Sequence, residues 1–389
     1  MTQTLALKDR DLFWPPADEL TEATERIRAS LGDWPPTHAP WRICLTAPDE
    51  PNGGDLIVVA EADAARHREQ AARWLVRGAA VVEAAENKAA LHLGGETYRL
   101  EGHLAEDWIP ALAAFLDCGF DPHDALVLAL AWRDGDETRH DANAANAANA
   151  ANAANAANAA GDAFPSDLAT FPRLAGLPQA PAQPFPRCPE RLGLYPVLPS
   201  AEWVERVVGF GVKTVQLRRK SAHPADELQR EIARCVAAGR QHDAQVFIND
   251  HWQAALAAGA YGVHLGQEDV HTADLSALAA AGIRLGLSTH GFYEILKALH
   301  FRPSYIALGA VFPTTTKVMP TAPQGLRRLA RYVRLLDGVV PLVAIGGIDL
   351  QVLPDVLATG VGCAAVVRAV TEAADPAAAV SALQQSFTQ

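Results

Sequence analysis

Residues 245–269 read QVFINDHWQAALAAGAYGVHLGQED and contain a strand pattern, a helix pattern and a second strand pattern in succession. Both strand patterns are short and apolar, with β-branched or aromatic residues that favour strands. The first ends in Asn249-Asp250 and the second runs into Glu268-Asp269. A strand–helix–strand unit returns the chain to the same edge before the second strand begins, so this stretch predicts neighbouring parallel strands.

The same alternation continues in both directions, with helical stretches such as 224–241 and 326–336 between the strand patterns. About eight such units in roughly 200 residues match the lower end of the size range of a closed barrel. We therefore predict a (β/α)₈ TIM barrel in the C-terminal half, with an open doubly wound sheet as the alternative. The eight runs are LGLYPVLP from Leu192, TVQLRRK from Thr214, QVFIND from Gln245, GVHLGQ from Gly262, RLGLSTH from Arg284, YIALGAVF from Tyr305, VPLVAIGG from Val340 and CAAVVRAV from Cys363.

A chain of 389 residues exceeds the size at which one hydrophobic core keeps growing, which predicts two folded units. Residues 141–160 repeat Asn-Ala-Ala, and a proline-rich stretch follows; neither has the pattern of a packed element. We predict a smaller α/β accessory domain over 1–140, a low-complexity linker over 141–189 and the barrel over 190–389.

Composition excludes several classes of protein. Apolar residues make up 49% of the chain and charged residues 20%, as in a soluble globular protein. A formal net charge of −12 argues against nonspecific nucleic-acid binding. No apolar run reaches the roughly 18 residues of a membrane-spanning helix, and the N-terminus lacks a signal-peptide pattern. We expect a cytoplasmic protein with five reduced cysteines; whether it forms a homo-oligomer stays open.

Polar residues follow most of the predicted strands, at the barrel end where active sites lie. Each group alone has an ordinary interpretation as a turn, a glycine break or a solvated charge run. Their agreement at one end of one barrel favours a functional site. The groups are Gln216-Leu217-Arg218-Arg219-Lys220, Asn249-Asp250, Gln267-Glu268-Asp269, Ser288-Thr289-His290, Thr314-Thr315-Thr316-Lys317 and Gly346-Gly347.

The acidic strand ends predict a magnesium site. Asp250 and Asp269 are hard oxygen ligands on neighbouring strands, and Glu268 is a weaker third candidate. Mg²⁺ takes one or two carboxylates together with waters and substrate phosphates. No pair of nucleophile and base is evident, and His264, inside a strand, is interpreted as a packed, hydrogen-bonded histidine.

Cationic residues predict an anionic substrate. Arg218, Lys220 and Lys317 can hold a diphosphate and neutralise the charge that grows on it as a leaving group. The Gly346-Gly347 turn lets backbone N–H groups approach a second phosphate.

These motifs resemble those of the thiamine-phosphate synthase family over roughly Leu192 to Phe387. The matching stretches are QLRRK from Gln216, FINDHWQAALAAGAYGVHLGQED from Phe247, GLSTH from Gly286, GAVFPTTTK from Gly309 and VAIGGI from Val343. The family ends its eighth strand with Val-Ser-Ala or a similar sequence, whereas this chain has Val367-Arg368-Ala369. The role of Arg368 therefore stays open.

The resemblance implies a transferase that joins 4-amino-5-hydroxymethyl-2-methylpyrimidine diphosphate to 4-methyl-5-hydroxyethylthiazole phosphate, or to its carboxylated form, with Mg²⁺. Lys317, Ser288 and Arg218 would be catalytic. Alternatives are a thiazole tautomerase of the same fold, a bifunctional kinase-synthase and a non-catalytic thiamine-binding or regulatory protein. By the same resemblance the pyrimidine diphosphate is held by Gln216, Arg218, Lys220 and Asn249, Mg²⁺ by Asp250 and Asp269, the pyrimidine by Ser288, phosphate by Thr314, Thr316 and Lys317, and the thiazole phosphate by Gly347.

The first unit weakly resembles the C-terminal part of a hydroxymethylpyrimidine-phosphate kinase over residues 74–132. Such kinases need a glycine-rich anion hole, and the corresponding residues 102–107, GHLAED, lack those glycines. We expect a non-catalytic accessory domain.

Overall fold

The structure, a computed structural model, describes residues 11–35, 41–133, 163–219, 224–314 and 321–388. The chain divides into two compact units, unit 1 (Met1–Leu177) and unit 2 (Pro178–Gln389). Each is described by itself. No helix in the described ranges is long and apolar enough to cross a membrane.

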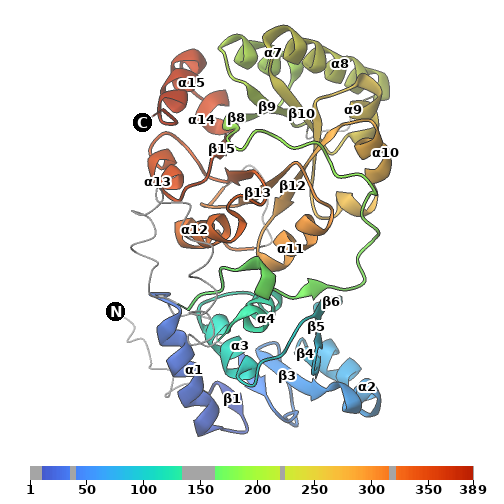
Figure 1. Cartoon of the computed structure of the whole chain (residues 1–389), viewed down its shortest axis with the longest axis vertical. Helices are drawn as coiled ribbons and strands as arrows, with labels where there is room; N and C mark the ends of the chain where they lie inside the picture. Colours follow the sequence, from blue (N-terminus) through green and yellow to red (C-terminus); the bar gives the residue numbers. More distant parts are fainter. Residues whose placement is uncertain (1–10, 36–40, 134–162, 220–223, 315–320, 389) are drawn as a thin grey trace. The chain divides into compact units, whose positions relative to one another are not determined.

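Unit 1 is a separate α/β domain, as predicted, and its strands follow one another across a single sheet in chain order. Figure 1 labels most of these strands. The first four strands pair in parallel and the remaining pairs are antiparallel. The strands are β1 (Phe13–Trp14), β2 (Arg42–Cys44), β3 (Asp55–Ala60), β4 (Ala80–Ala85), β5 (Lys88–Leu93), β6 (Glu96–Glu101) and β7 (Arg173–Leu174).

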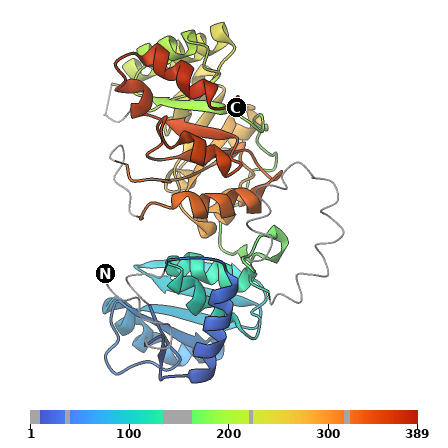
Figure 2. The same cartoon turned by 90° about the vertical axis from the view of Figure 1, so that its left-hand side faces the viewer.

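In the described ranges of unit 1, four α-helices accompany this sheet: α1 (Asp18–Ser30), α2 (Glu61–Val76), α3 (Trp108–Asp117) and α4 (Pro122–Ala131). Helices α1, α3 and α4 pack on one another in sequence, whereas α2 packs on β3 and β4 (Figure 2).

The described part of the predicted linker differs from a simple spacer. Phe164 stacks on Trp34 with ring centroids 5.4 Å apart, and it also meets the ring of Phe120. Strand β7 then pairs with β6, which places Leu174 beside Leu100. These residues fold with unit 1 because they bury aromatic surface and satisfy the edge of its sheet. Residues 134–162, with the Asn-Ala-Ala repeat, lie outside the described residues.

Unit 2 is a closed barrel of eight parallel strands, as predicted. Strand β15 pairs with β8, so the sheet has no edge and the open-sheet alternative is wrong. The strands are β8 (Gly193–Leu198), β9 (Thr214–Leu217), β10 (Gln245–Asn249), β11 (Gly262–Leu265), β12 (Arg284–Thr289), β13 (Tyr305–Gly309), β14 (Leu342–Ile345) and β15 (Cys363–Val366).

The outer helices alternate with these strands, and their buried residues recur at helical spacing. On α8 the buried side of the helix includes Ile232, Cys235 and Val236. The α-helices are α7 (Ala201–Gly209), α8 (Ala225–His242), α9 (Trp252–Ala258), α10 (Leu275–Ala280), α11 (Phe292–His300), α12 (Gly325–Leu336), α13 (Leu353–Ala358), α14 (Arg368–Thr371) and α15 (Pro376–Gln385).

Alternate residues of the strands fill the barrel, including Tyr195, Phe247 and Tyr305. A Cβ atom at Gly286 would overlap the Tyr305 ring, so a glycine is required beside that ring. The barrel interior is therefore a packed core rather than a channel.

All five cysteines are buried and none forms a disulfide. Burial raises the pKa of the Cys188 thiol and that of the Cys235 thiol to about 12. These thiols are protonated and unreactive at neutral pH, which agrees with the expected reduced, structural cysteines.

Candidate active site

Two predicted site residues lie at or near the C-terminal ends of adjacent barrel strands. Gln216 is buried on β9, and Asn249 is the last residue of β10 and also buried. In the strand register Phe247 lies beside Gln216, and Asn249 lies beside His264 of β11. The closed sheet therefore brings Gln216, Asn249 and the residues that follow them to one end of the barrel.

The two candidate metal ligands follow β10 and β11. Asp250 is exposed and left-handed, with a φ of 63°, and its N–H donates to the carbonyl of His264 at 3.0 Å. Asp269 begins a short 3₁₀ helix, and its Oδ2 accepts from the Gly266 N–H at 3.2 Å. Both aspartates are thus anchored through β11, within two residues of its end.

These residues fit Mg²⁺. Among the described residues no group of three or more His, Cys, Asp or Glu could hold a metal ion. Mg²⁺ needs no such cage, because it retains waters and binds substrate phosphates beside one or two carboxylates. Asp250 and Asp269 are therefore a candidate pair of carboxylate ligands for Mg²⁺.

The two arginines after β9 differ in their ion pairs. Arg219 forms an ion pair with the outer helix α8, in which its Nε lies 2.9 Å from Glu231 Oε2. Its Nη1 also donates to the Pro199 carbonyl at 3.2 Å. Arg218 is half-buried, and its guanidinium has no ion-pair partner among the described residues. Arg218 therefore has no carboxylate partner in the described part of the chain, and its role in holding a diphosphate stays a prediction.

Ser288, on β12, is held on both sides by polar groups of β11 and the loop after it. His264 Nε2 lies 2.8 Å from Ser288 Oγ, and Gln267 Nε2 donates to the Ser288 carbonyl at 2.7 Å. The Oε1 atom of Gln267 is buried without a hydrogen-bond partner in the described structure. Gln267 is therefore a further candidate site residue, which the sequence placed in a polar group at a strand end but to which it assigned no role.

The Gly346-Gly347 turn follows β14 and packs against the segment that follows β13. Both glycines have positive φ values, 105° and 67°. The Phe312 N–H donates to the Gly346 carbonyl at 3.0 Å, and a Cβ atom on Gly347 would lie 2.7 Å from Phe312 Cβ. No side chain fits at Gly347, and its N–H donates to no acceptor in the described ranges, so the amide is available to an anion.

Several predicted site residues lie at the edge of the described ranges or outside them. Thr314 is half-buried and is the last described residue before a gap. Lys220, Thr316 and Lys317 lie outside the described residues. Arg368 is exposed at the first position of α14.

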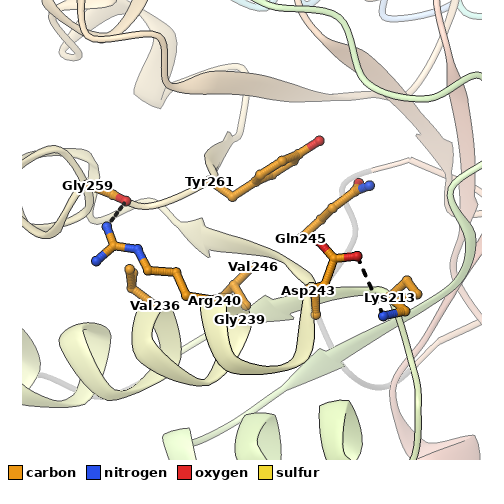
Figure 3. A pocket seen from close by; sticks show the side chains of 10 residues that line it. Lys213, Val236, Gly239, Arg240, Asp243, Gln245, Val246, Gly259 and Tyr261 are labelled. Carbon is orange, nitrogen blue, oxygen red and sulfur yellow. Dashed lines mark hydrogen bonds and ion pairs between the residues drawn. The ribbon is translucent and has the colours of Figure 1, made fainter.

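A hollow of about 500 Å³ opens at the opposite end of the barrel, around the residues that precede β9, β10 and β11. Figure 3 shows that its charged side chains already have partners: Arg240 donates to the Gly259 carbonyl at 3.1 Å, and Lys213 lies 3.9 Å from Asp243. In a TIM barrel this end serves stability, so the hollow is not the candidate site.

A model of the thiamine monophosphate synthase family matches residues 194–370. Proteins named thiamine-phosphate synthase are similar to this chain: one from Neisseria meningitidis serogroup A is 63% identical over 193 residues, which are 50% of this chain and 93% of the relative. One from Salmonella paratyphi A is 57% identical over 192 residues, 49% of this chain and 90% of the relative. A solved structure of thiamine phosphate pyrophosphorylase from Pyrococcus furiosus has 32% identity and a TM-score of 0.45, covering 51% of this chain and 96% of that one.

Proposed function

The chain belongs to the thiamine monophosphate synthase family, and from this premise we propose that unit 2 is a thiamine-phosphate synthase acting through the strand-end site described above. The observation that carries the proposal is the 63% identity to a named thiamine-phosphate synthase over 93% of that relative. The barrel supports it, because Gln216, Asn249 and Ser288 lie on its strands and Asp250 and Asp269 follow them.

The proposed reaction is a substitution at the methylene carbon of the pyrimidine substrate. The bond from this carbon to the diphosphate oxygen breaks, and its electron pair leaves with diphosphate. The thiazole ring nitrogen supplies the electron pair of the new carbon–nitrogen bond. Thiamine phosphate and diphosphate are the products, and no general base is required because the nitrogen carries no proton to remove.

The chain's own residues bind and orient the two phosphates. The guanidinium of Arg218, which has no ion-pair partner among the described residues, attracts the diphosphate, together with Lys220 and Lys317, which lie outside those residues. The Gly347 N–H donates to the thiazole phosphate, and Thr314 and Thr316 supply further hydroxyls. Lys317 assists departure of the diphosphate, and Ser288 contacts the pyrimidine.

Asp250 and Asp269 would hold Mg²⁺, which neutralises charge on the leaving diphosphate when bound. The small-molecule substrates explain why the site needs local cations although the whole chain is acidic, with a net charge of −12. Unit 1 is proposed to be a non-catalytic accessory domain, and a cytoplasmic location is proposed for the whole chain.

The test is to incubate the purified full chain with both phosphorylated substrates and Mg²⁺ and to measure thiamine phosphate by chromatography. We expect product with both substrates and none when either substrate or the metal is withheld. Conversion of a thiazole phosphate isomer without metal would support the tautomerase alternative instead. Binding of thiamine phosphate without turnover would support the non-catalytic alternative.

A further inference from the structure

A chain of five hydrogen-bonded side chains crosses the barrel interior and ends at Ser288. The five residues come from five different strands, β9, β8, β13, β11 and β12. The links are Gln216 Nε2 to Tyr195 Oη at 3.2 Å, Tyr195 Oη to Tyr305 Oη at 2.9 Å, Tyr305 Oη to His264 Nδ1 at 2.7 Å and His264 Nε2 to Ser288 Oγ at 2.8 Å.

The hydrogens along this chain point in one direction. The amide nitrogen of Gln216 can only donate, so Tyr195 accepts from it. The single hydroxyl hydrogen of Tyr195 then has Tyr305 as its acceptor, and the hydrogen of Tyr305 has His264 Nδ1. Burial raises the pKa of both tyrosines well above its ordinary value, so both keep the hydrogen that this argument requires.

The direction determines the tautomer of His264. Since Nδ1 accepts, the neutral ring carries its hydrogen on Nε2 and donates it to Ser288 Oγ. An imidazolium would donate from both nitrogens, so Tyr305 would have to donate back to Tyr195. Tyr195 would then accept twice, and its own hydrogen would have no acceptor in the buried interior.

Ser288 is therefore left with its own hydroxyl hydrogen to donate. Its Oγ accepts from His264 and its carbonyl is held by Gln267, so the residue is constrained from two sides. The hydroxyl sits one residue before the end of β12, at the active-site end of the barrel.

We propose that Tyr305 and His264 are positioning residues that leave the Ser288 hydroxyl hydrogen free to be donated, so that this hydroxyl donates to an acceptor atom of the substrate, a ring nitrogen of the pyrimidine. The inference rests on the proposed function for the identity of the substrate. The tautomer of His264 does not depend on the proposed function, because it follows from the hydrogen bonds of the protein alone.

The tautomer is measured by ¹⁵N NMR of the histidine rings in the full chain without substrate, with His264 assigned by its loss in His264→Gln. We expect hydrogen on Nε2 and none on Nδ1. Hydrogen on Nδ1 would mean that these hydrogen bonds are donated in the opposite direction and that Ser288 donates to the imidazole. That result would overturn the inference.

The functional part is measured with a double-mutant cycle of Tyr305→Phe and Ser288→Ala. Tyr305→Phe removes the donor that orients the imidazole, and we expect KM for the pyrimidine diphosphate to rise about fivefold to tenfold with little change in KM for the thiazole phosphate. In the Ser288→Ala background the same change should have almost no effect on KM.

Thr214→Val is the matched control, because it also removes one buried hydroxyl, bonded at 3.1 Å to the Leu192 carbonyl at the other end of the barrel. It should lower the melting temperature similarly and leave both KM values unchanged. An equal Tyr305→Phe effect with and without Ser288 would reduce Tyr305 to a structural role and refute the proposal. A wild-type chain that makes no thiamine phosphate would refute the proposed function instead, while the NMR result would still decide the tautomer.

Discussion

Two aspartates flank β10, and both adopt the left-handed backbone conformation that few L-residues other than Asn and Asp tolerate. Asp243 precedes the strand with a φ of 49°, and Asp250 follows it with a φ of 63°. Asp243 lies at the end without the candidate site, with its side chain fully exposed and 3.9 Å from Lys213. The pair therefore separates a backbone role, which both share, from a metal-binding role, which only Asp250 has in our proposal.

Asparagine is the informative replacement, because it tolerates a left-handed conformation and removes only the charge. We expect Asp250→Asn and Asp269→Asn each to lower turnover at limiting Mg²⁺ on the order of 10²-fold, since each removes a carboxylate that would hold the metal. Steady-state rates over a Mg²⁺ titration test this. Asp243→Asn is the control and should retain the wild-type rate. Near-normal rates in both Asp250→Asn and Asp269→Asn would show that these two residues do not hold the metal.

At the scale of elements, the turn after β14 depends on two different properties of glycine. Gly347 has a positive φ, and a Cβ atom there would also lie 2.7 Å from the Pro313 carbonyl oxygen. Gly338, which precedes the same strand, has a similar φ of 69°, but a Cβ atom there would meet nothing within 4 Å. The two positions share the conformational requirement and differ in the available space.

We expect Gly338→Ala to cost about 1 kcal/mol of unfolding free energy from the left-handed conformation alone and to keep its activity. Gly347→Ala should cost more and lower kcat/KM for the thiazole phosphate at least about tenfold, because it displaces the segment that leads to Thr314. Denaturant unfolding and steady-state kinetics measure both effects. Equal stability loss and equal activity in the two variants would show that the close approach at Gly347 has no functional role.

The elements that the sequence predicts well are those whose burial follows a simple period. The stretch 224–241 matches α8 at Ala225–His242, and the run from Arg284 matches β12 at Arg284–Thr289. Residues 109–132 are different, because nearly every position is apolar and no face stands out. They form two helices, α3 and α4, separated where Gly119 takes a φ of 81°.

In the candidate site, too, local sequence patterns predict some residues and miss their contacts. Strand ends identify Asp250, Asp269 and Ser288, because a barrel brings all its strand ends together. The partners of His264 are 24 and 41 residues away in sequence, on two other strands. A packed, hydrogen-bonded histidine could be predicted, but its bonds to Tyr305 and Ser288 depend on the register of the closed sheet, which no local pattern contains.

At the scale of the whole molecule, residues 178–189 belong to the barrel and not to a spacer. His300 Nε2 lies 2.8 Å from the Pro178 carbonyl oxygen, and Arg187 donates to the Val339 carbonyl at 2.7 Å. Phe185 is buried, and Cys188 packs in the barrel's core cluster. The sequence placed the start of the barrel at 190 because prolines dominate the preceding stretch, yet proline does not prevent a segment from packing along a surface.

Two shortened chains, one beginning at Pro178 and one at Pro189, test whether residues 178–188 belong to the barrel. The first retains every contact named above, so we expect it to fold alone and to keep kcat/KM within about twofold of the full chain. The second loses Phe185 and Cys188, and burying a phenylalanine alone contributes roughly 1.5–3 kcal/mol, so its melting temperature should be clearly lower. Thermal unfolding and the synthase assay, both at equal Mg²⁺, measure the difference. Equal stability of the two shortened chains would show that residues 178–188 are part of the linker, as the sequence predicted. If the chain from Pro178 is active only when unit 1 is added, the barrel requires unit 1.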